Sequence, residues 1–90
     1  MRRFELKQEM IFRRVGEEIL LINLVTNQIY ELNFTAARFW ELICEGRNDE
    51  EILKKIGEEF RVSKDQLSIE SEKLLAKLEQ GDFITIYDER

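Results

Sequence analysis

The sequence predicts an α+β domain in which a three-stranded antiparallel sheet precedes three helices, with room for one more short strand at the C-terminal end. Three observations support this fold class. The first third of the chain contains short apolar runs separated by turn residues, which is typical of strands. The remainder places apolar residues at helical spacing, and an Asn or Ser that can cap a helix precedes each such stretch. No repeat or linker interrupts residues 1–90, so we expect a single domain.

Each predicted strand has its own pattern. The three runs are EMIFRRV, EILLINL and QIYEL, at residues 9–15, 18–24 and 28–32. The first alternates loosely, as an edge strand does, whereas the second is apolar on both faces and suits the central position. The turn signals Gly16-Glu17 and Thr26-Asn27 are short, which favours an antiparallel meander.

Three helices are predicted at residues 34–45, 49–60 and 64–80. Their candidate caps are Asn33 and Gly46, Asn48 with Glu51, and Ser63 with Gln66 and Gly81. The expected core-facing residues are Ala36, Ala37, Trp40, Ile43 and Cys44 on the first helix, and Ile52, Leu53, Ile56 and Phe60 on the second.

The last two helices and the C-terminal segment complete the predicted fold. The second and third helices, joined through residues 61–63, resemble a helix-turn-helix pair, so we expect a winged helix-turn-helix-like architecture. Residues 83–87 alternate weakly, and they can either pair with the sheet as a short strand or fray.

The charge balance argues against a nucleic-acid partner. The chain has 14 basic and 19 acidic residues, a net charge of −5. Nucleic-acid binders draw most of their non-specific affinity from Lys and Arg. The predicted third helix carries Asp65, Glu70 and Glu72 where a recognition helix would present donors to the bases. DNA binding by a winged helix therefore stays as a disfavoured alternative.

The residue types that most catalysis needs are missing. The chain has no His and one Cys, which removes Cys-His and Ser-His-Asp devices and zinc sites of the usual ligand types. Its four glycines, at positions 16, 46, 57 and 81, are too far apart for a phosphate-binding loop. We expect a protein that is not an enzyme and that uses no metal and no cofactor.

The cysteine usage and the apolar runs bear on location. Cys44, which we expect to be buried, has no second cysteine with which to form an internal disulfide. The N-terminal residues have no apolar segment of the signal-peptide kind, and no run approaches the length of a membrane span. We expect a cytoplasmic protein without a membrane partner.

The stretch LLINLVTNQIYELNFTAARFWELICEG resembles the PqqD-like family, the small recognition domains of ribosomally made peptide natural products. The matching residues are Leu20, Leu21, Leu24, Tyr30, Leu32, Asn33, Ala36, Ala37, Phe39, Trp40 and Leu42, followed by Gly46, Asn48, Glu50, Glu51, Ile52, Phe60, Val62, Leu78 and Gly81 to Ile84. The resemblance covers roughly residues 9–86. Within the family, the pattern is most similar to the stand-alone lasso-peptide members, although Ala36 stands where many members carry Gly.

The resemblance implies a function in peptide maturation. Such a protein binds the leader of a precursor peptide and presents it to a separate leader protease. A close alternative is the peptide chaperone of pyrroloquinoline quinone biosynthesis, which hands its precursor to a radical enzyme. A structural module once fused to a larger enzyme is a third reading.

The resemblance also implies a site. The third strand should be an exposed sheet edge to which the leader adds as an antiparallel strand, with the third helix as the opposite wall. The implied edge residues are Gln28, Ile29, Tyr30, Glu31 and Leu32, and the implied wall residues are Ser71, Leu74, Leu75 and Leu78. An aromatic leader side chain is expected against Leu74, Leu75 or Leu78. Glu31 and Glu72 are expected to favour a leader with lysines. A bare edge can also pair with a second copy, which leaves a homodimer open.

Overall fold

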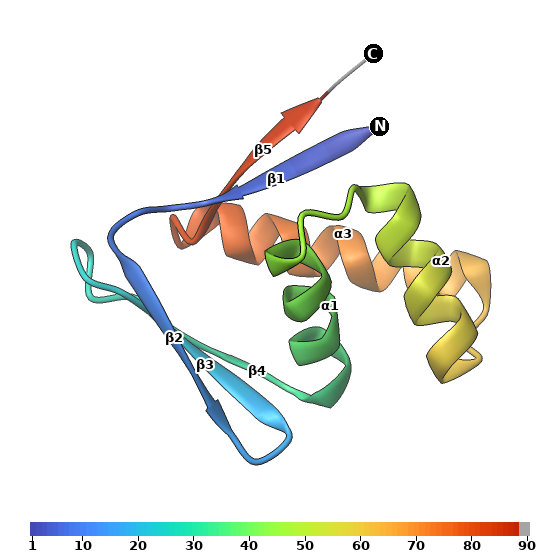
Figure 1. The fold of residues 1–90 in the computed structure, drawn as a ribbon, viewed down its shortest axis with the longest axis horizontal. Coiled ribbons are helices and arrows are strands. Elements are labelled where there is room, and N and C mark those ends of the chain that lie inside the picture. The colour runs from blue at the N-terminus through green and yellow to red at the C-terminus, as the bar shows by residue number, and fades with distance from the viewer. Residues whose placement is uncertain (89–90) are drawn as a thin grey trace.

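The computed structural model describes residues 1–88 and confirms the α+β fold class, with a three-stranded antiparallel sheet and three helices (Figure 1). The elements, in chain order, are β1 (Arg2–Leu6), β2 (Met10–Val15), β3 (Glu18–Asn23), β4 (Ile29–Leu32), α1 (Phe34–Cys44), α2 (Asp49–Phe60), α3 (Lys64–Gln80) and β5 (Ile84–Asp88). None of the helices in this part of the chain is long and apolar enough to cross a membrane.

The predicted meander is present, with the strand order β2-β3-β4. Both pairings are antiparallel, and Leu21 in the central strand lies opposite Phe12 on one side and Tyr30 on the other. Alternate residues of β3, namely Ile19, Leu21 and Asn23, are buried against the helical side of the sheet. Because β3 occupies the centre, β4 has its second edge free of any strand in the described part of the chain.

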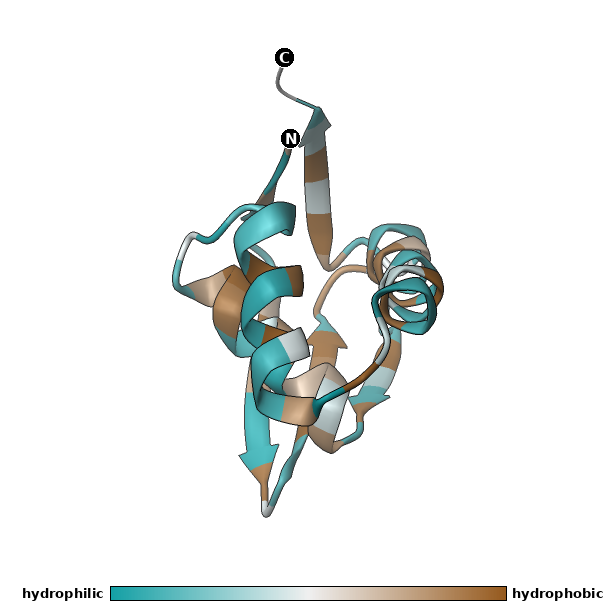
Figure 2. Cartoon of the chain, turned by 90° about the vertical axis from the view of Figure 1, so that its right-hand side faces the viewer, coloured by the Kyte–Doolittle hydropathy of each residue, from teal (hydrophilic) through white to brown (hydrophobic). Residues whose placement is uncertain are grey.

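A second sheet was not predicted. β1 pairs with β5 in an antiparallel ribbon in which Arg2 lies opposite Asp88 and Leu6 opposite Ile84. The C-terminal strand predicted at residues 83–87 thus forms, but it pairs with β1 and not with the three-stranded sheet. Along β5, Figure 2 shows hydrophobic bands alternating with paler ones. The two strands lie at opposite ends of the chain, so no local turn signal announces their pairing.

The helix caps follow the predicted residues. Asn33 is the only residue between β4 and α1, and its side chain accepts a hydrogen bond from the Ala36 amide at 3.0 Å. Asn48 and Glu51 form the complete capping box at the start of α2. Ser63 caps α3 by accepting a bond from the Gln66 amide. After α1, Gly46 adopts the left-handed conformation, with φ +84°.

Gly81 ends α3 for a reason other than the one predicted. Its φ is −83°, and the left-handed residue is its neighbour Asp82, with φ +58°. A Cβ atom at position 81 would overlap the ring of Phe83, which is 1% exposed. The glycine therefore permits a close approach of the buried ring and is not required by backbone strain.

The core is centred on Trp40, which is fully buried and meets Phe12 edge-on at 5.6 Å between ring centroids. The prediction that Cys44 belongs to this core is wrong, because Cys44 is exposed. It is the last residue of α1 and lies about 100° around the helix from buried Ile43. Phe39 and Leu42, which match the family pattern but stand outside the expected core-facing set, complete the buried face.

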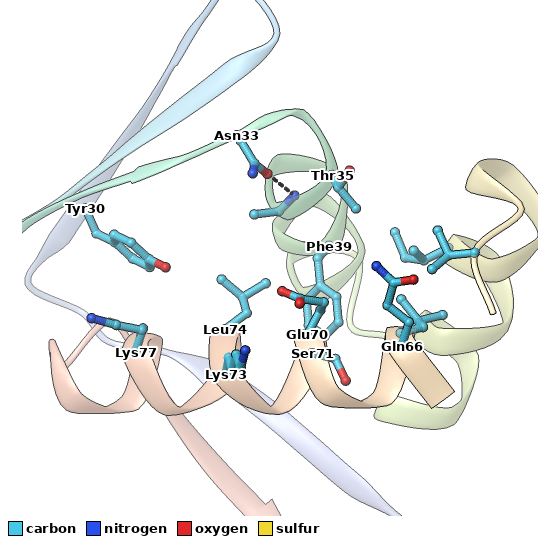
Figure 3. A pocket seen from close by; sticks show the side chains of 14 residues that line it. Tyr30, Asn33, Thr35, Phe39, Gln66, Glu70, Ser71, Lys73, Leu74 and Lys77 are labelled. Atoms are coloured by element: carbon cyan, nitrogen blue, oxygen red, sulfur yellow. Dashed lines mark hydrogen bonds between the residues drawn. The ribbon is translucent and has the colours of Figure 1, made fainter. Parts of the chain in front are cut away.

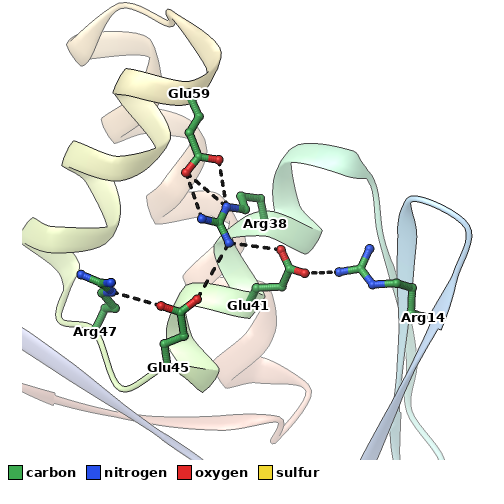
Figure 4. A network of polar contacts seen from close by, with 6 residues as sticks. All are labelled: Arg14, Arg38, Glu41, Glu45, Arg47 and Glu59. Atoms are coloured by element: carbon green, nitrogen blue, oxygen red, sulfur yellow. Dashed lines mark hydrogen bonds and ion pairs between the residues drawn. The ribbon is translucent and has the colours of Figure 1, made fainter.

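The polar face of α1 is joined to β2 and α2 by an ion-pair network (Figure 4). At its centre, Arg38 donates from Nε to Glu59 Oε1 on α2 at 2.9 Å and lies 3.4 Å from Glu41. Glu41 also pairs with Arg14 on β2. The hydrogen bond from Arg38 lowers the pKa of Glu59. Exposed pairs contribute little each, roughly 0–1 kcal/mol, and these pairs link α1 to both β2 and α2.

Candidate functional site

A groove with a volume of about 390 Å³ lies between the β4–α1 junction and α3 (Figure 3). Its lining residues are Tyr30, Asn33, Thr35, Ala36, Phe39, Ile56, Val62, Gln66, Leu67, Glu70, Ser71, Lys73, Leu74 and Lys77. Phe39, Ile56 and Leu67 are buried core residues that form an apolar floor. The rim is polar, because α3 contributes Gln66, Glu70 and the two lysines.

The backbone N–H and C=O groups of β4 point in two directions. The Asn23 amide donates to the Gln28 carbonyl at 2.9 Å, and Tyr30 and Leu32 lie opposite Leu21 and Ile19. Hydrogen-bonded and non-hydrogen-bonded pairs alternate along an antiparallel ladder. The backbone groups of Tyr30 and Leu32 are therefore directed to β3, whereas those of Ile29 and Glu31 face outward from the sheet. These outward groups can pair with an incoming strand.

The side chains of the predicted edge do not all face the groove. Tyr30 is half-buried and lines it, and Leu32, 1% exposed, belongs to the core. Ile29, 62% exposed, and Glu31 lie on the opposite face of the sheet. Gln28 and Ile29 help to line a second hollow of about 300 Å³, which also contains Tyr30 and Lys77. This second hollow, which we call the end hollow, extends the groove towards the C-terminal end of α3.

The residues predicted for the α3 wall divide into two groups. Ser71 and Leu74 line the groove, and the Ser71 hydroxyl donates to the Ser68 carbonyl at 3.0 Å. Leu75 and Leu78, which are 1% and 0% exposed, pack in the core and do not line it. The sequence-based choice of these two as wall residues needs correction. The apolar stripe of α3 faces the core, and the groove side begins one helical position away.

Glu72 also lies away from the groove. It forms an ion pair with Arg2, which in turn donates from Nε to Asp49 Oδ2 at 3.1 Å. The Arg2 amide donates to the same carboxyl group at 2.9 Å. Burial alone would raise the pKa of Asp49, but these hydrogen bonds outweigh it and hold the pKa below its ordinary value of 3.8. Arg2 thereby ties β1 to both α2 and α3 and supports the outer side of the wall.

Sequence reasoning missed the basic residues of the groove. Lys73 and Lys77 lie one helical turn apart on α3 and both line the groove, with Gln66 and Glu70 further along the same rim. A signal for them exists in the sequence, since residues spaced by three or four positions share a helix face. That spacing places Lys73 and Lys77 on one face of α3, and the half-buried Leu74 lies three positions before Lys77.

Asn23 is a second missed residue. It is 4% exposed, and its side-chain amide donates to the Asp82 carbonyl at 2.8 Å and to the Gly81 carbonyl at 3.3 Å. Its Oδ1 accepts from the amides of Val25 and Thr26. Asn23 thus connects the β3–β4 turn to the α3–β5 turn. These contacts hold the beginning of β4 at a fixed distance from the end of α3, and so they set the width of the end hollow.

The single cysteine lies outside the groove. Cys44 is exposed as a residue, but partial desolvation of its thiol raises the pKa of that group, and the nearby carboxylates of Glu41 and Glu45 raise it further. A raised pKa keeps the thiol protonated at neutral pH and makes it a weak nucleophile.

Comparison with solved structures finds the same fold in two peptide complexes. One is TbiB1 in complex with the TbiA(beta) leader peptide, with a TM-score of 0.86 and 22% sequence identity over 94% of this chain and 99% of that chain. The other is lasso peptide synthetase B1 complexed with the leader peptide, with a TM-score of 0.82 and 17% identity over 92% and 98%. The comparison with curated proteins gives no match.

A family model matches most of the chain, and the matched residues include the whole groove from β4 to α3. The model that matches is that of coenzyme PQQ synthesis protein D, over residues 18–84. It takes in the meander from β3 onward, all three helices and the start of β5. The chain therefore belongs to the PqqD family.

Proposed function

We propose that the protein binds the leader region of a ribosomally synthesised precursor peptide, most specifically a lasso-peptide precursor, and delivers it to a separate leader protease. The observation that carries the proposal is the free edge of β4, which borders an apolar groove closed by α3. The two similar structures, which are complexes with leader peptides, support it.

In this proposal the leader adds to β4 as an antiparallel strand. The outward backbone groups of Ile29 and Glu31 bind its main chain, which gives affinity with little dependence on sequence. Alternate leader side chains then face α3, and a bulky apolar one fits between Phe39 and Leu74. The direct junction of β4 to α1 through Asn33 holds the edge rigid, which lowers the ordering cost of binding.

The protein itself acts as a carrier in this proposal, and a partner enzyme cleaves the leader. The sequence has no His to activate a nucleophile, and its one thiol is kept protonated. We place this activity in the cytoplasm, where the lone cysteine stays reduced. The homodimer stays a prediction, and it would use the same edge of β4 as the leader, so the two would exclude each other.

A second candidate is a peptide chaperone for pyrroloquinoline quinone synthesis, which the family model favours by its description. The same groove would then receive a different precursor and present it to a radical enzyme. DNA binding is not proposed, because α3 exposes Asp65, Glu70 and Glu72 and the net charge is −5.

The proposal is tested by fluorescence anisotropy with labelled leader peptides from lasso precursors and from the quinone precursor. We expect a lasso leader to bind more tightly than the quinone precursor. Glu31→Pro removes an outward N–H without touching the ladder to β3, and it should weaken binding about tenfold, the equivalent of one hydrogen bond.

The matched control is Arg14→Pro on β2, the other edge strand of the same sheet. The Leu24 amide bonds to the Glu9 carbonyl, so alternation along the β2–β3 ladder turns the Arg14 N–H outward as well. This variant should bind the leader like the wild type and melt close to Glu31→Pro, apart from the small loss of the exposed Arg14–Glu41 pair. Equal binding by both proline variants would reject strand addition on β4.

A further inference from the structure

The groove carries a local charge that differs from that of the whole molecule. Although the net charge is −5, Lys73 and Lys77 both line the groove from α3. Neither lysine takes part in any ion pair that the structure shows within residues 1–88. Figure 3 shows Tyr30 and Lys77 on facing walls of the groove. The basic groups therefore stand at the end of the groove nearest the end hollow, without an internal partner.

The acidic residues that were expected to select lysines lie elsewhere. Glu31 is exposed on the other face of the sheet, and Glu72 is paired with Arg2. The one carboxylate in the groove lining, Glu70, lies two helical turns from Lys77 but only one turn before Lys73. The groove is thus polarised along α3, with Glu70 and Gln66 towards its N-terminal half and the lysines towards its C-terminal half.

The helix dipole does not account for both lysines. Lys77 lies in the last turn of α3, where a positive charge interacts favourably with the helix dipole. Lys73 is a turn earlier, beyond the range of that effect. Glu70, three positions before it, attracts it, and Lys77, four positions after it, repels it. An anionic group between them would remove this repulsion.

We propose that Lys73 and Lys77 form a subsite for a carboxylate side chain of the bound peptide, an Asp or Glu. This inference rests on the proposed function. Tyr30, a half-buried residue of the opposite wall, carries a hydroxyl that can serve as a further donor in the groove. Lys73 and Lys77 make a charge-selective subsite beside the apolar one at Phe39 and Leu74, so the groove selects one acidic and one apolar side chain of the peptide.

The geometry also fixes the order of the two recognised residues. A peptide antiparallel to β4 runs from the Asn33 end of the groove towards Gln28 and the end hollow. Its bulky apolar residue meets Leu74 first, and its acidic residue meets Lys77 afterwards. Because alternate residues of a strand share a face, the acid follows the apolar residue at an even spacing, two or four positions towards the C-terminus.

The experiment starts with a displayed library of random decapeptides selected against the wild-type protein. Enriched peptides should carry Asp or Glu two or four positions after an aromatic or aliphatic residue. The best peptide and its Glu→Gln counterpart are then synthesised with a fluorescent label. In low salt the wild type should bind the Glu peptide about threefold to tenfold more tightly, and the difference should shrink as salt is added.

The protein variants distinguish this subsite from the general field of the molecule. The double variant Lys73→Gln/Lys77→Gln should bind both peptides equally. The control Lys54→Gln/Lys55→Gln changes two exposed α2 lysines outside the groove by the same total charge and should keep the preference. The reversal Lys73→Glu/Lys77→Glu should prefer a peptide with Lys in place of Glu.

The outcomes separate the two proposals. Peptides that bind through β4 but show no acidic preference, or a preference that survives in Lys73→Gln/Lys77→Gln, would overturn the subsite and leave the proposed function intact. A library without any enriched peptide would count against peptide binding itself, and the subsite would fall with it.

Discussion

A single side chain, that of Asn23, determines how far the beginning of β4 lies from the end of α3, and so the width of the end hollow. Asn23 is buried and makes four hydrogen bonds to backbone groups of two turns, two as donor and two as acceptor. Its burial comes from its position on the helical side of β3, where Ile19 and Leu21 are its neighbours in the alternation. A polar residue in such a position stabilises the fold only while its partners are present.

Asn23→Ala should lower the free energy of unfolding by about 2 kcal/mol, because buried backbone groups lose their partners. It should also weaken leader binding more than this loss of stability explains, since the end hollow would no longer have a fixed width. Thermal melting and anisotropy titration measure the two effects. Thr26→Ala, in the same turn, is the control and should change both by much less. A folded Asn23→Ala protein with unaltered affinity would show that the hydrogen bonds of Asn23 do not affect leader binding.

Two adjacent leucines on α3 should respond differently to the same change. Leu75→Glu puts a carboxylate into the core, where an unpaired charge is costly, and this variant should fail to fold. Leu74→Glu places it at the half-buried groove wall, so the protein should fold and its leader affinity should fall by about 2 kcal/mol. Circular dichroism and anisotropy decide the matter. Unchanged affinity in a folded Leu74→Glu protein would remove Leu74 from the site.

At the scale of elements, turn and capping residues in the sequence predicted the bounds of the strands and helices that they begin or end. The meander and the three helices lie within one or two residues of the predicted bounds, because Asn33, Asn48 and Ser63 cap their helices through neighbouring amides. The strand β1 was missed because its partner β5 is at the other end of the chain and no turn joins them.

The same limit applies to the groove. The free edge at β4 followed from strand order and the resemblance to a family. The groove side of α3 depends on how that helix is rotated against the sheet, and the apolar stripe alone indicates only the core side. For this reason the stripe predicts Leu75 and Leu78 as wall residues although they are buried in the core, and it gives no indication of Lys73 and Lys77, which line the groove.

At the scale of the whole molecule, Arg2 joins three elements that are far apart in the sequence. The low pKa of Asp49 means that its ionised form is the one stabilised by folding. This contribution is fully present above the ordinary value of 3.8 and is lost as the pH falls from there through the lowered pKa of the folded protein. The attachment of β1 to α2 is therefore expected to weaken in acid.

Asp49→Asn should be less stable than the wild type by about 1–2 kcal/mol at neutral pH, because it loses charge-assisted bonds from Arg2 and a negative charge at the start of α2. The difference should shrink as the pH falls below 3.8, first because the carboxyl group of the unfolded chain takes up a proton and then, at lower pH, because that of the folded protein does. Urea unfolding at a series of pH values measures it. Asp65→Asn, in the first turn of α3, is the control and should show a smaller loss. A stability gap that stays constant down to about pH 2 would contradict the assignment.

The ribbon of β1 and β5 places the two ends of the fold beside each other, with Arg2 opposite Asp88 (Figure 1). No residue of either strand lines the groove or the end hollow. A tether attached at either end would thus leave the molecule from the same corner. The domain can in this way be carried by a larger protein, or anchored to a surface, with its binding edge still open to a passing peptide.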